Sequence, residues 1–273
     1  MDIAQNVNYQ GLATKWPSIA IWNRVEQAAR GSQGGFIWED NFLGFNGSVT
    51  SNVGTYSSQG GGWVSYEDTG AVVAPLATEV GGVLKMTTDT TDNDEIWLSP
   101  GTATSVMAKI TSGDSGVLAF ECRVRPSQIV TQNAFFGFSE EGCAVADTIT
   151  DSDVMITTKD WIGFRVNADD DAYMDFTYQK ASQTAQIVID DMKLLVADTW
   201  YKFGFLYDAS APTAKRIRVF VDGVEQSTYV TATNIAAATF PSGEELNVLM
   251  GLKNNAGAAT RWDCDWIKVG FAY

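Results

Sequence analysis

Hydrophobic and polar residues alternate along most of the chain with a period of two, which is the spacing of a β-strand with one buried face. In the segment GVLAFECRVR, Leu118, Phe120 and Val124 share one face, and the polar or small residues between them are expected to face water. Residues 200–207 repeat this pattern with four aromatic side chains at odd positions. Strands that bury one face in this way are typical of antiparallel sheets.

The same alternation predicts about a dozen short strands separated by turn residues. They cover residues 36–42, 82–88, 95–99, 116–125, 134–138, 161–166, 172–179, 185–190, 200–207, 216–221, 224–230, 245–253 and 261–273. The glycine- and serine-rich stretch 48–63 is expected to be a loop. In the last strand the apolar phase slips between Trp266 and Ile267, which predicts a bulge or a crossing between sheets. The pattern as a whole predicts an all-β, antiparallel sandwich or barrel.

The segment RIRVFVDGVEQSTYV gives the sharpest local prediction. Ile217, Val219 and Val221 lie on one face of a strand that ends at Asp222-Gly223. Asp-Gly favours a type I′ turn, because both central residues of that turn need positive φ. The segment is therefore expected to be a β-hairpin whose aliphatic face is buried between two sheets.

The first 35 residues differ from the rest of the chain and predict an N-terminal arm, followed by one domain over residues 36–273. Residues 18–30 are expected to form a short helix, with Ser18 as its N-cap and Gly31 after its end. A helix this short is marginal in water, so it must dock either on its own β domain or on a neighbouring subunit. The candidate partner-binding residues of the arm are Trp16, Ile19, Trp22 and Val25.

Charge and composition exclude several classes of function. The 273-residue chain has a formal net charge of −15, so binding to nucleic acid or to an anionic membrane is not expected. Histidine is absent, which rules out histidine-based nucleophile systems and general bases. The first residues have no basic segment followed by an apolar one, so a secretory signal is not expected and the protein is expected to stay in the cytoplasm that makes it.

Three cysteines, Cys122, Cys143 and Cys264, are far apart in the sequence and odd in number. This spacing fits neither a disulfide framework nor a zinc site. Cys122 lies within an alternating strand and is expected to be a buried free thiol.

Four short motifs together resemble the concanavalin A-like and laminin G-like jelly rolls. They are Trp200-Tyr201, Val221-Asp222-Gly223, Met250-Gly251-Leu252 and Asp265-Trp266-Ile267, in the order in which that superfamily has them. The resemblance covers residues 36–273 by pattern and is sharpest over 199–273. It implies an all-β, antiparallel, two-sheet jelly-roll sandwich, in a superfamily that includes lectins, glycosidases, adhesion modules and viral structural proteins.

Catalysis by a glycosidase of this fold would need paired carboxylates on one strand face. Asp263 and Asp265 share a face, but no third acidic residue follows in register, and the pair is expected to be solvated. A carboxylate-based glycoside hydrolase is therefore the third choice, and the chain is predicted not to be an enzyme.

Two binding sites are also considered. Asp169, Asp170 and Asp171 crowd one turn and could hold Ca²⁺, the one cofactor that the sequence leaves open, although acidic residues are common in ordinary turns. Trp63 and Tyr66, beside the glycine-rich stretch, are candidate platforms for stacking on a sugar ring, although core packing explains most tryptophans.

The absent signal, the absent histidine, the acidic jelly roll and the tryptophan-containing arm lead to one main hypothesis. The chain is predicted to be a bacteriophage virion structural protein, a capsid decoration protein whose arm docks on capsid or other virion proteins or on another copy in a homo-oligomer. The alternative is a carbohydrate-binding module of a tail fibre or surface protein, with a glycan as its partner.

Overall fold

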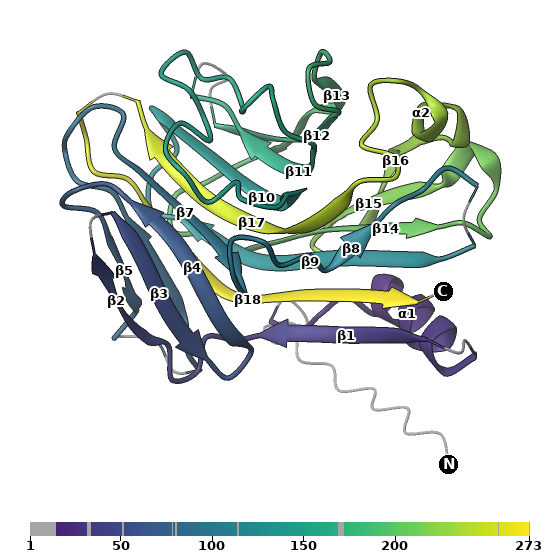
Figure 1. Cartoon of the computed structure of the whole chain (residues 1–273), viewed down its shortest axis with the longest axis horizontal. Helices are drawn as coiled ribbons and strands as arrows, with labels where there is room; N and C mark the ends of the chain where they lie inside the picture. The colour runs from purple at the N-terminus through teal and green to yellow at the C-terminus, as the bar shows by residue number, and fades with distance from the viewer. Residues whose placement is uncertain are drawn as a thin grey trace.

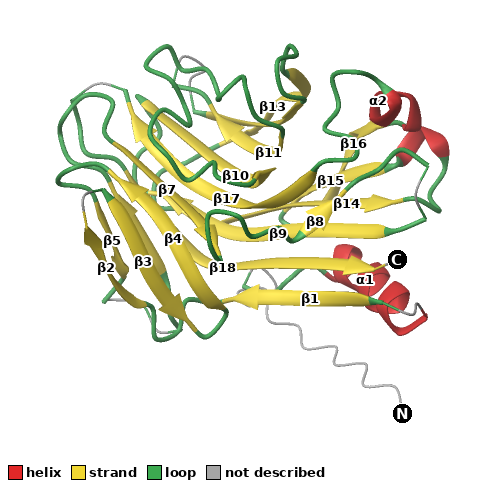
Figure 2. Ribbon diagram, viewed as in Figure 1, coloured by secondary structure: helices red, strands yellow, loops and turns green. Residues whose placement is uncertain are grey.

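The computed structural model describes residues 15–31, 34–50, 52–77, 79, 81–113, 115–168, 172–255 and 257–272. Two antiparallel sheets form the body of the molecule (Figure 1). The helical elements are short and lie outside the sheets (Figure 2): α1 (Ile19–Gly31), α2 (Ala232–Ala236) and a single 3-10 turn (Thr213–Lys215). The predicted all-β sandwich is confirmed.

Within the described residues, one sheet has eight strands and the other has ten. The eight-stranded sheet runs in the order β16 (Val224–Val230), β15 (Ile217–Val221), β14 (Tyr201–Asp208), β9 (Val117–Pro126), β18 (Arg261–Ala272), β6 (Leu84–Thr87), β5 (Val72–Pro75), and β1 (Gly35–Asp40) also pairs with β18. The ten-stranded sheet runs in the order β13 (Gln186–Leu194), β12 (Tyr173–Gln179), β11 (Trp161–Val166), β10 (Gln132–Glu140), β17 (Glu245–Asn254), β7 (Glu95–Pro100), β4 (Gly61–Glu67), β3 (Val53–Ser58), β2 (Asn46–Thr50), and β8 (Ala108–Lys109) also pairs with β17.

The main core lies between the two sheets and is rich in aromatic side chains. Phe120 of β9, Phe138 of β10 and Phe205 of β14 are fully buried there, with ring centroids 5.5 to 5.9 Å apart. Cys122 is a free, buried thiol in the same cluster, as predicted. Burial of each large apolar side chain contributes about 1.5–3 kcal/mol, so this cluster is the main source of stability.

The predicted hairpin forms between β15 and β16. Ile217, Val219 and Val221 enter the main core, and Asp222 and Gly223 have φ values of 51° and 81°. Both turn residues are therefore in the left-handed region that a type I′ turn requires. The predicted slip in the last strand is also present, as a bulge between Cys264 and Trp266 in the pairing of β18 with β9.

One predicted loop is wrong. Most of the stretch 48–63 belongs to β2, β3 and the start of β4 instead. Glycines allow these strands to approach closely, since a Cβ at Gly47 would lie 2.6 Å from the ring of Tyr56. Tyr56 stacks on Phe45 with ring centroids 4.7 Å apart, which buries this end of the sheet. Glycine and serine here serve packing rather than flexibility.

Helix α1 packs on the outer face of the eight-stranded sheet, beside β18 (Figure 1). Its apolar face is buried against side chains from β9, β14 and β15: Ile21, Trp22 and Val25 over Val117, Ala119, Leu206 and Phe220. Gly204 and Gly270 leave room for the helix, because a Cβ at either would lie 2.6 Å from a side chain of α1. The expectation that the polar and small residues of β9 face water is therefore wrong for the part of β9 under the helix.

Glu121 is the polar centre of this helix–sheet contact. Its side chain is 1% exposed and accepts hydrogen bonds from the Ser18 backbone N–H (2.8 Å), the Ser18 hydroxyl and the Trp22 indole N–H (2.7 Å). Burial raises the pKa of Glu121. The Ser18 hydroxyl, predicted to cap the helix, thus bonds to a carboxylate of the sheet.

One remaining expectation concerns the division of the chain into domains. The division into an arm of residues 1–35 and a domain of residues 36–273 stays a prediction, because residues 1–14 lie outside the described part. Among the described residues, neither helix has the length and apolar character needed to cross a bilayer.

Candidate functional site

The loop of residues 141–160, which we call the strap, covers the middle of the outer face of the ten-stranded sheet. Side chains that point outward from four strands are buried beneath it because apolar residues of the strap pack on them. This cluster contains Trp97, Phe135, Cys143, Ile149, Met155, Trp161 and Leu249. This part of the face is therefore filled by the protein's own chain.

Buried polar side chains of the sheet hold the strap in place. Lys253, whose side chain is 1% exposed, donates to the Ile149 carbonyl (2.9 Å) and to the Asp151 carboxylate (2.6 Å). Glu95 of β7 accepts a hydrogen bond from the backbone N–H of Asp147 (2.5 Å). Each anchor replaces the water that these groups lose on burial, so the strap is bound by specific contacts as well as by apolar packing.

An open pocket lies at the rim of this sheet, where the β4–β5 loop meets the β6–β7 loop. Its volume is about 490 Å³. We call it the acidic pocket, and it is lined by Asp68, Thr69, Asp89, Thr91, Asp92, Asn93 and Asp94. None of these seven lining residues is basic, so the pocket presents mainly hydrogen-bond acceptors.

Fixed hydrogen bonds hold the walls of the acidic pocket. Asp68 accepts from the Tyr66 hydroxyl (2.8 Å) and from the backbone N–H of Glu95 (3.2 Å). On the other wall, the Asp94 carboxylate accepts from the backbone N–H of Asp89 (2.7 Å). Asn254, at the end of β17, binds this wall by donating to the Asp89 carbonyl (2.9 Å). The Asp68 and Asp94 carboxylates are thus positioned before any ligand arrives.

Crowding and burial change the protonation of this region. Burial raises the pKa of Asp94 to about 6, and the negative charges of Asp89 and Asp68 add to the shift. Burial also raises the pKa of Glu95 to about 7, although the Trp97 N–H, 2.6 Å away, and the charge of Lys253 act in the opposite direction. Near neutral pH the pocket is an anionic set of acceptors.

The two predicted sugar platforms, Trp63 and Tyr66, lie on opposite faces of β4 and differ in burial. Trp63 is 1% exposed, packs on Phe42 with centroids 5.6 Å apart and donates its indole N–H to Asp40 (2.7 Å). Its prediction as a sugar platform is wrong, because β4 points this residue into the core. Tyr66 faces the opposite way, is half-buried and bonds to Asp68 at the acidic pocket.

The four predicted partner-binding residues of the arm fall into a buried pair and an exposed pair. Trp22 and Val25 are buried against the chain's own sheet, so they are not free to bind a partner, and that expectation is corrected. Trp16 and Ile19 are 65% and 81% exposed. The helical periodicity that grouped them could not show which face the sheet would cover.

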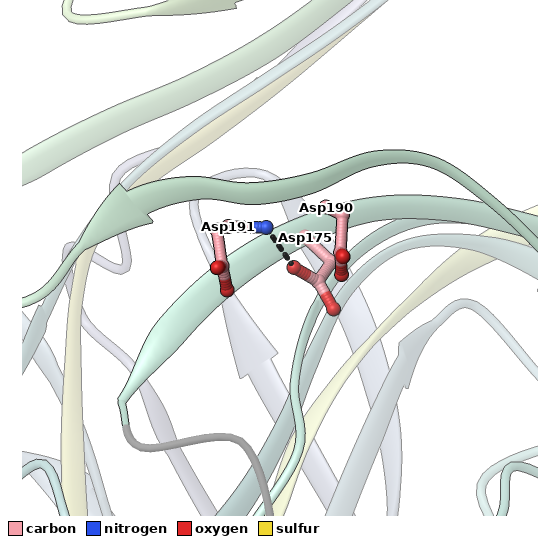
Figure 3. Close-up of side chains that lie close together, drawn as sticks. All are labelled: Asp175, Asp190 and Asp191. Atoms are coloured by element: carbon pink, nitrogen blue, oxygen red, sulfur yellow. Dashed lines mark hydrogen bonds between the residues drawn. The ribbon is translucent and has the colours of Figure 1, made fainter.

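The calcium ligands predicted at Asp169, Asp170 and Asp171 lie outside the described residues. Just beyond them, Asp175 of β12 and Asp190 and Asp191 of β13 bring carboxylate oxygens within 4.8 Å of one another (Figure 3). The Asp191 backbone N–H donates to Asp175 (2.9 Å). Such oxygens suit Ca²⁺, but they come from paired strands with no sequence motif, so strand pairing alone brings them together.

Asp263 and Asp265 form buried ion pairs instead of the expected solvated pair. Asp263 accepts from Arg125 at 2.7 Å, and Asp265 accepts from Arg123 at 2.6 Å. Asp263 is fully buried and Asp265 is 4% exposed. Arginine side chains thus neutralise both carboxylates on the outer face of the eight-stranded sheet.

No protein-family model and no curated protein sequence matches the chain. Solved structures do match its fold. Peanut lectin aligns with a TM-score of 0.54 at 11% identity, over 88% of this chain and 98% of that one. The carbohydrate recognition domain of Emp47p aligns with a TM-score of 0.51 at 14% identity, over 87% of this chain and 96% of that one.

The laminarinase catalytic domain of Thermotoga maritima MSB8 aligns with a TM-score of 0.50 at 11% identity, over 86% of this chain and 97% of that one. A catalytic domain therefore shares this fold, and the prediction that the chain is not an enzyme is overturned. At these identities the comparisons establish the architecture. The chain has the jelly-roll sandwich fold that peanut lectin, the Emp47p carbohydrate recognition domain and the laminarinase catalytic domain share.

Proposed function

We propose that the chain binds neutral carbohydrate and that the acidic pocket is the binding site. The observation that carries the proposal is this pocket of about 490 Å³, in which hydrogen bonds hold the Asp68 and Asp94 carboxylates in place, Asp68 beside the ring of Tyr66. The fold supports the proposal, since the structures that resemble it include a lectin and a carbohydrate recognition domain. This is the alternative that the sequence had left open.

The lining chemistry suits sugar hydroxyl groups. A hydroxyl donates a hydrogen bond, and hydrogen bonds to a charged acceptor contribute about 1.5–3 kcal/mol each. Asp92 is exposed, while Asp68 and Asp89 are half-buried, so they offer such acceptors at the mouth and on the walls of the pocket. A saccharide that carries carboxylates or sulfates would be repelled by the same groups.

Substitution at the pocket mouth tests the proposal. Wild-type protein should bind neutral oligosaccharides on a glycan array, and calorimetry should then give the affinity of the best ligand. Asp92→Ala should weaken that affinity by about tenfold or more, the loss of one charge-assisted hydrogen bond. Asp198→Ala removes an exposed carboxylate outside the pocket and is the matched control.

Two results would refute the proposal. One is wild-type protein that binds no neutral glycan, or binds only acidic ones. The other is an Asp92→Ala variant that binds as tightly as wild type, which would place any sugar site elsewhere.

The capsid-decoration role, the virion location and capsid partners stay predictions. Neither the fold nor its structural neighbours bears on them. Their test is purification of the particle that carries the protein.

A further inference from the structure

A second open pocket, of about 310 Å³, lies at one end of the sandwich and shares no lining residue with the acidic pocket. It forms where the loop after β8, the end of β14, the residue before β15 and α2 meet (Figure 1). The helix α2 packs there on the 3-10 turn that precedes β15. We call it the arginine pocket, and its lining side chains are those of Ser112, Tyr207, Ala209, Arg216, Ala232 and Ile235.

Arg216 is the one charged residue of this lining, and its guanidinium has no partner. It forms no hydrogen bond and no ion pair with the described residues, and its Nη1 atom is buried. Every other arginine of the described residues pairs with a carboxylate or donates to a carbonyl oxygen. A buried donor without an acceptor is costly, because it has lost water and gained no hydrogen bond. Arg216 is thus a cation that is free to bind an anion.

The acidic residue beside Arg216 in the strand ladder is paired elsewhere. Asp208 donates its backbone N–H to the Arg216 carbonyl (2.9 Å), but its carboxylate binds Arg24 of α1 at 2.5 Å and accepts from the Ser210 hydroxyl (2.7 Å). Arg216 has φ of −67° and ψ of −40° at the end of the 3-10 turn, so the alternation of β15 begins only after it. No carboxylate of the described residues therefore neutralises Arg216.

The rest of the lining suits a small ligand with an apolar part. Ala209, Ala232 and Ile235 are apolar, and Ser112 and Tyr207 are the other polar residues. A guanidinium binds a carboxylate through two parallel hydrogen bonds. One cation balances one negative charge, so in a chain with a net charge of −15 a monocarboxylate fits better than a phosphate dianion. The volume is near the lower end of the range for small-molecule sites.

We propose that the arginine pocket binds a small monocarboxylate with a short apolar chain, whose carboxylate pairs with Arg216. One charge-assisted pair and a few apolar contacts predict a Kd of about 1 mM or below. The site is independent of the sugar site proposed above, because the two pockets have no residue in common. Loss of binding at one should leave the other unchanged.

Two-dimensional NMR on the full chain, titrated with isovalerate and with benzoate, tests the proposal. At least one of these carboxylates should shift the amide signals of Ala209, Arg216 and Ala232 in a saturable way. The matching uncharged amides, isovaleramide and benzamide, should bind about tenfold more weakly or not at all. Arg216→Gln should weaken carboxylate binding by about tenfold or more. Because Arg216 has no partner in the folded chain, this variant should melt no lower than wild type.

Arg218→Gln is the matched control, because it removes the same charge from β15 outside the pocket, where Arg218 pairs with Glu225. It should bind the carboxylates as wild type does. Ala232→Phe fills the pocket and keeps the cation, so it should also abolish binding and serves as the second variant should Arg216→Gln fail to fold.

The proposal is overturned if neither carboxylate binds wild-type protein, if the amides bind as tightly as the carboxylates, or if inorganic phosphate binds more tightly than both. It is equally overturned by an Arg216→Gln or Ala232→Phe variant that binds as wild type, or by an Arg218→Gln control that is weakened as much as Arg216→Gln.

Discussion

Glu121→Ala should lower the free energy of unfolding by about 3–5 kcal/mol, because it removes a buried carboxylate from the groups that it binds. The Ser18 backbone N–H and the Trp22 indole N–H both lose their acceptor inside the helix–sheet contact. Lys202 loses the attraction of the same carboxylate. We therefore expect α1 to leave the sheet before the rest of the protein unfolds.

Urea unfolding measures the loss of stability, and hydrogen exchange over residues 19–31 measures the release of α1. Glu225→Ala is the matched control, since Glu225 is partly exposed and forms only a 3.6 Å pair with Arg218. It should change stability by less than about 1 kcal/mol. A Glu121→Ala variant with a wild-type urea midpoint and a protected α1 would show that apolar packing alone holds the helix.

The second large effect is a loss of stability as the pH rises, caused by Glu95. Its pKa is about 7 in the folded protein and is near 4.5 in the unfolded chain. The unfolded state therefore releases the proton at lower pH than the folded state does. The contribution of Glu95 to stability is complete below about pH 4.5 and is lost as the pH rises through about 7, a change of about 3 kcal/mol.

The test compares the urea midpoints of wild type and Glu95→Gln between pH 4.5 and 8. The variant should lose less stability than wild type over this range, because its side chain does not ionise. The pKa of Asp94, raised to about 6, gives both proteins a further fall of the same sign. The lowered pKa of Asp208, about 2, acts only in more acidic solution and does not disturb the comparison.

Glu245→Gln, an exposed site on β17, provides the control and should follow wild type. Parallel profiles for Glu95→Gln and wild type would mean that Glu95 is already ionised at low pH beneath the strap. Hydrogen exchange at Asp147, whose N–H binds Glu95, reports whether the strap loosens as the carboxyl ionises.

Local pattern was enough to predict most strands and the hairpin. Side chains alternate across a strand whatever surrounds it, so the inward positions of Phe203 and Val219 could be read directly. The positive φ values at Asp222 and Gly223 likewise follow from the residue types. The alternation pattern did not predict β2 and β3, because polar residues and glycine fill most positions of these strands.

The candidate site was much less predictable. Tyr66 was identified, but its partner Asp68 and the facing residues Asp89 and Asp94 were not, because two loops meet only when β4 pairs with β7. Trp63 shows the same limit, since an isolated aromatic does not reveal which face of its strand is buried.

The sequence by itself determined the all-β class, the period of the strands and the turn chemistry, because these depend on backbone sterics and near neighbours. Only the tertiary structure decided that α1 covers Glu121, that the strap covers the middle of the outer face of the ten-stranded sheet and that carboxylates gather at the rim of that sheet. Each of these depends on contacts between residues far apart in the chain. Their positions follow from strand order, which no local pattern encodes.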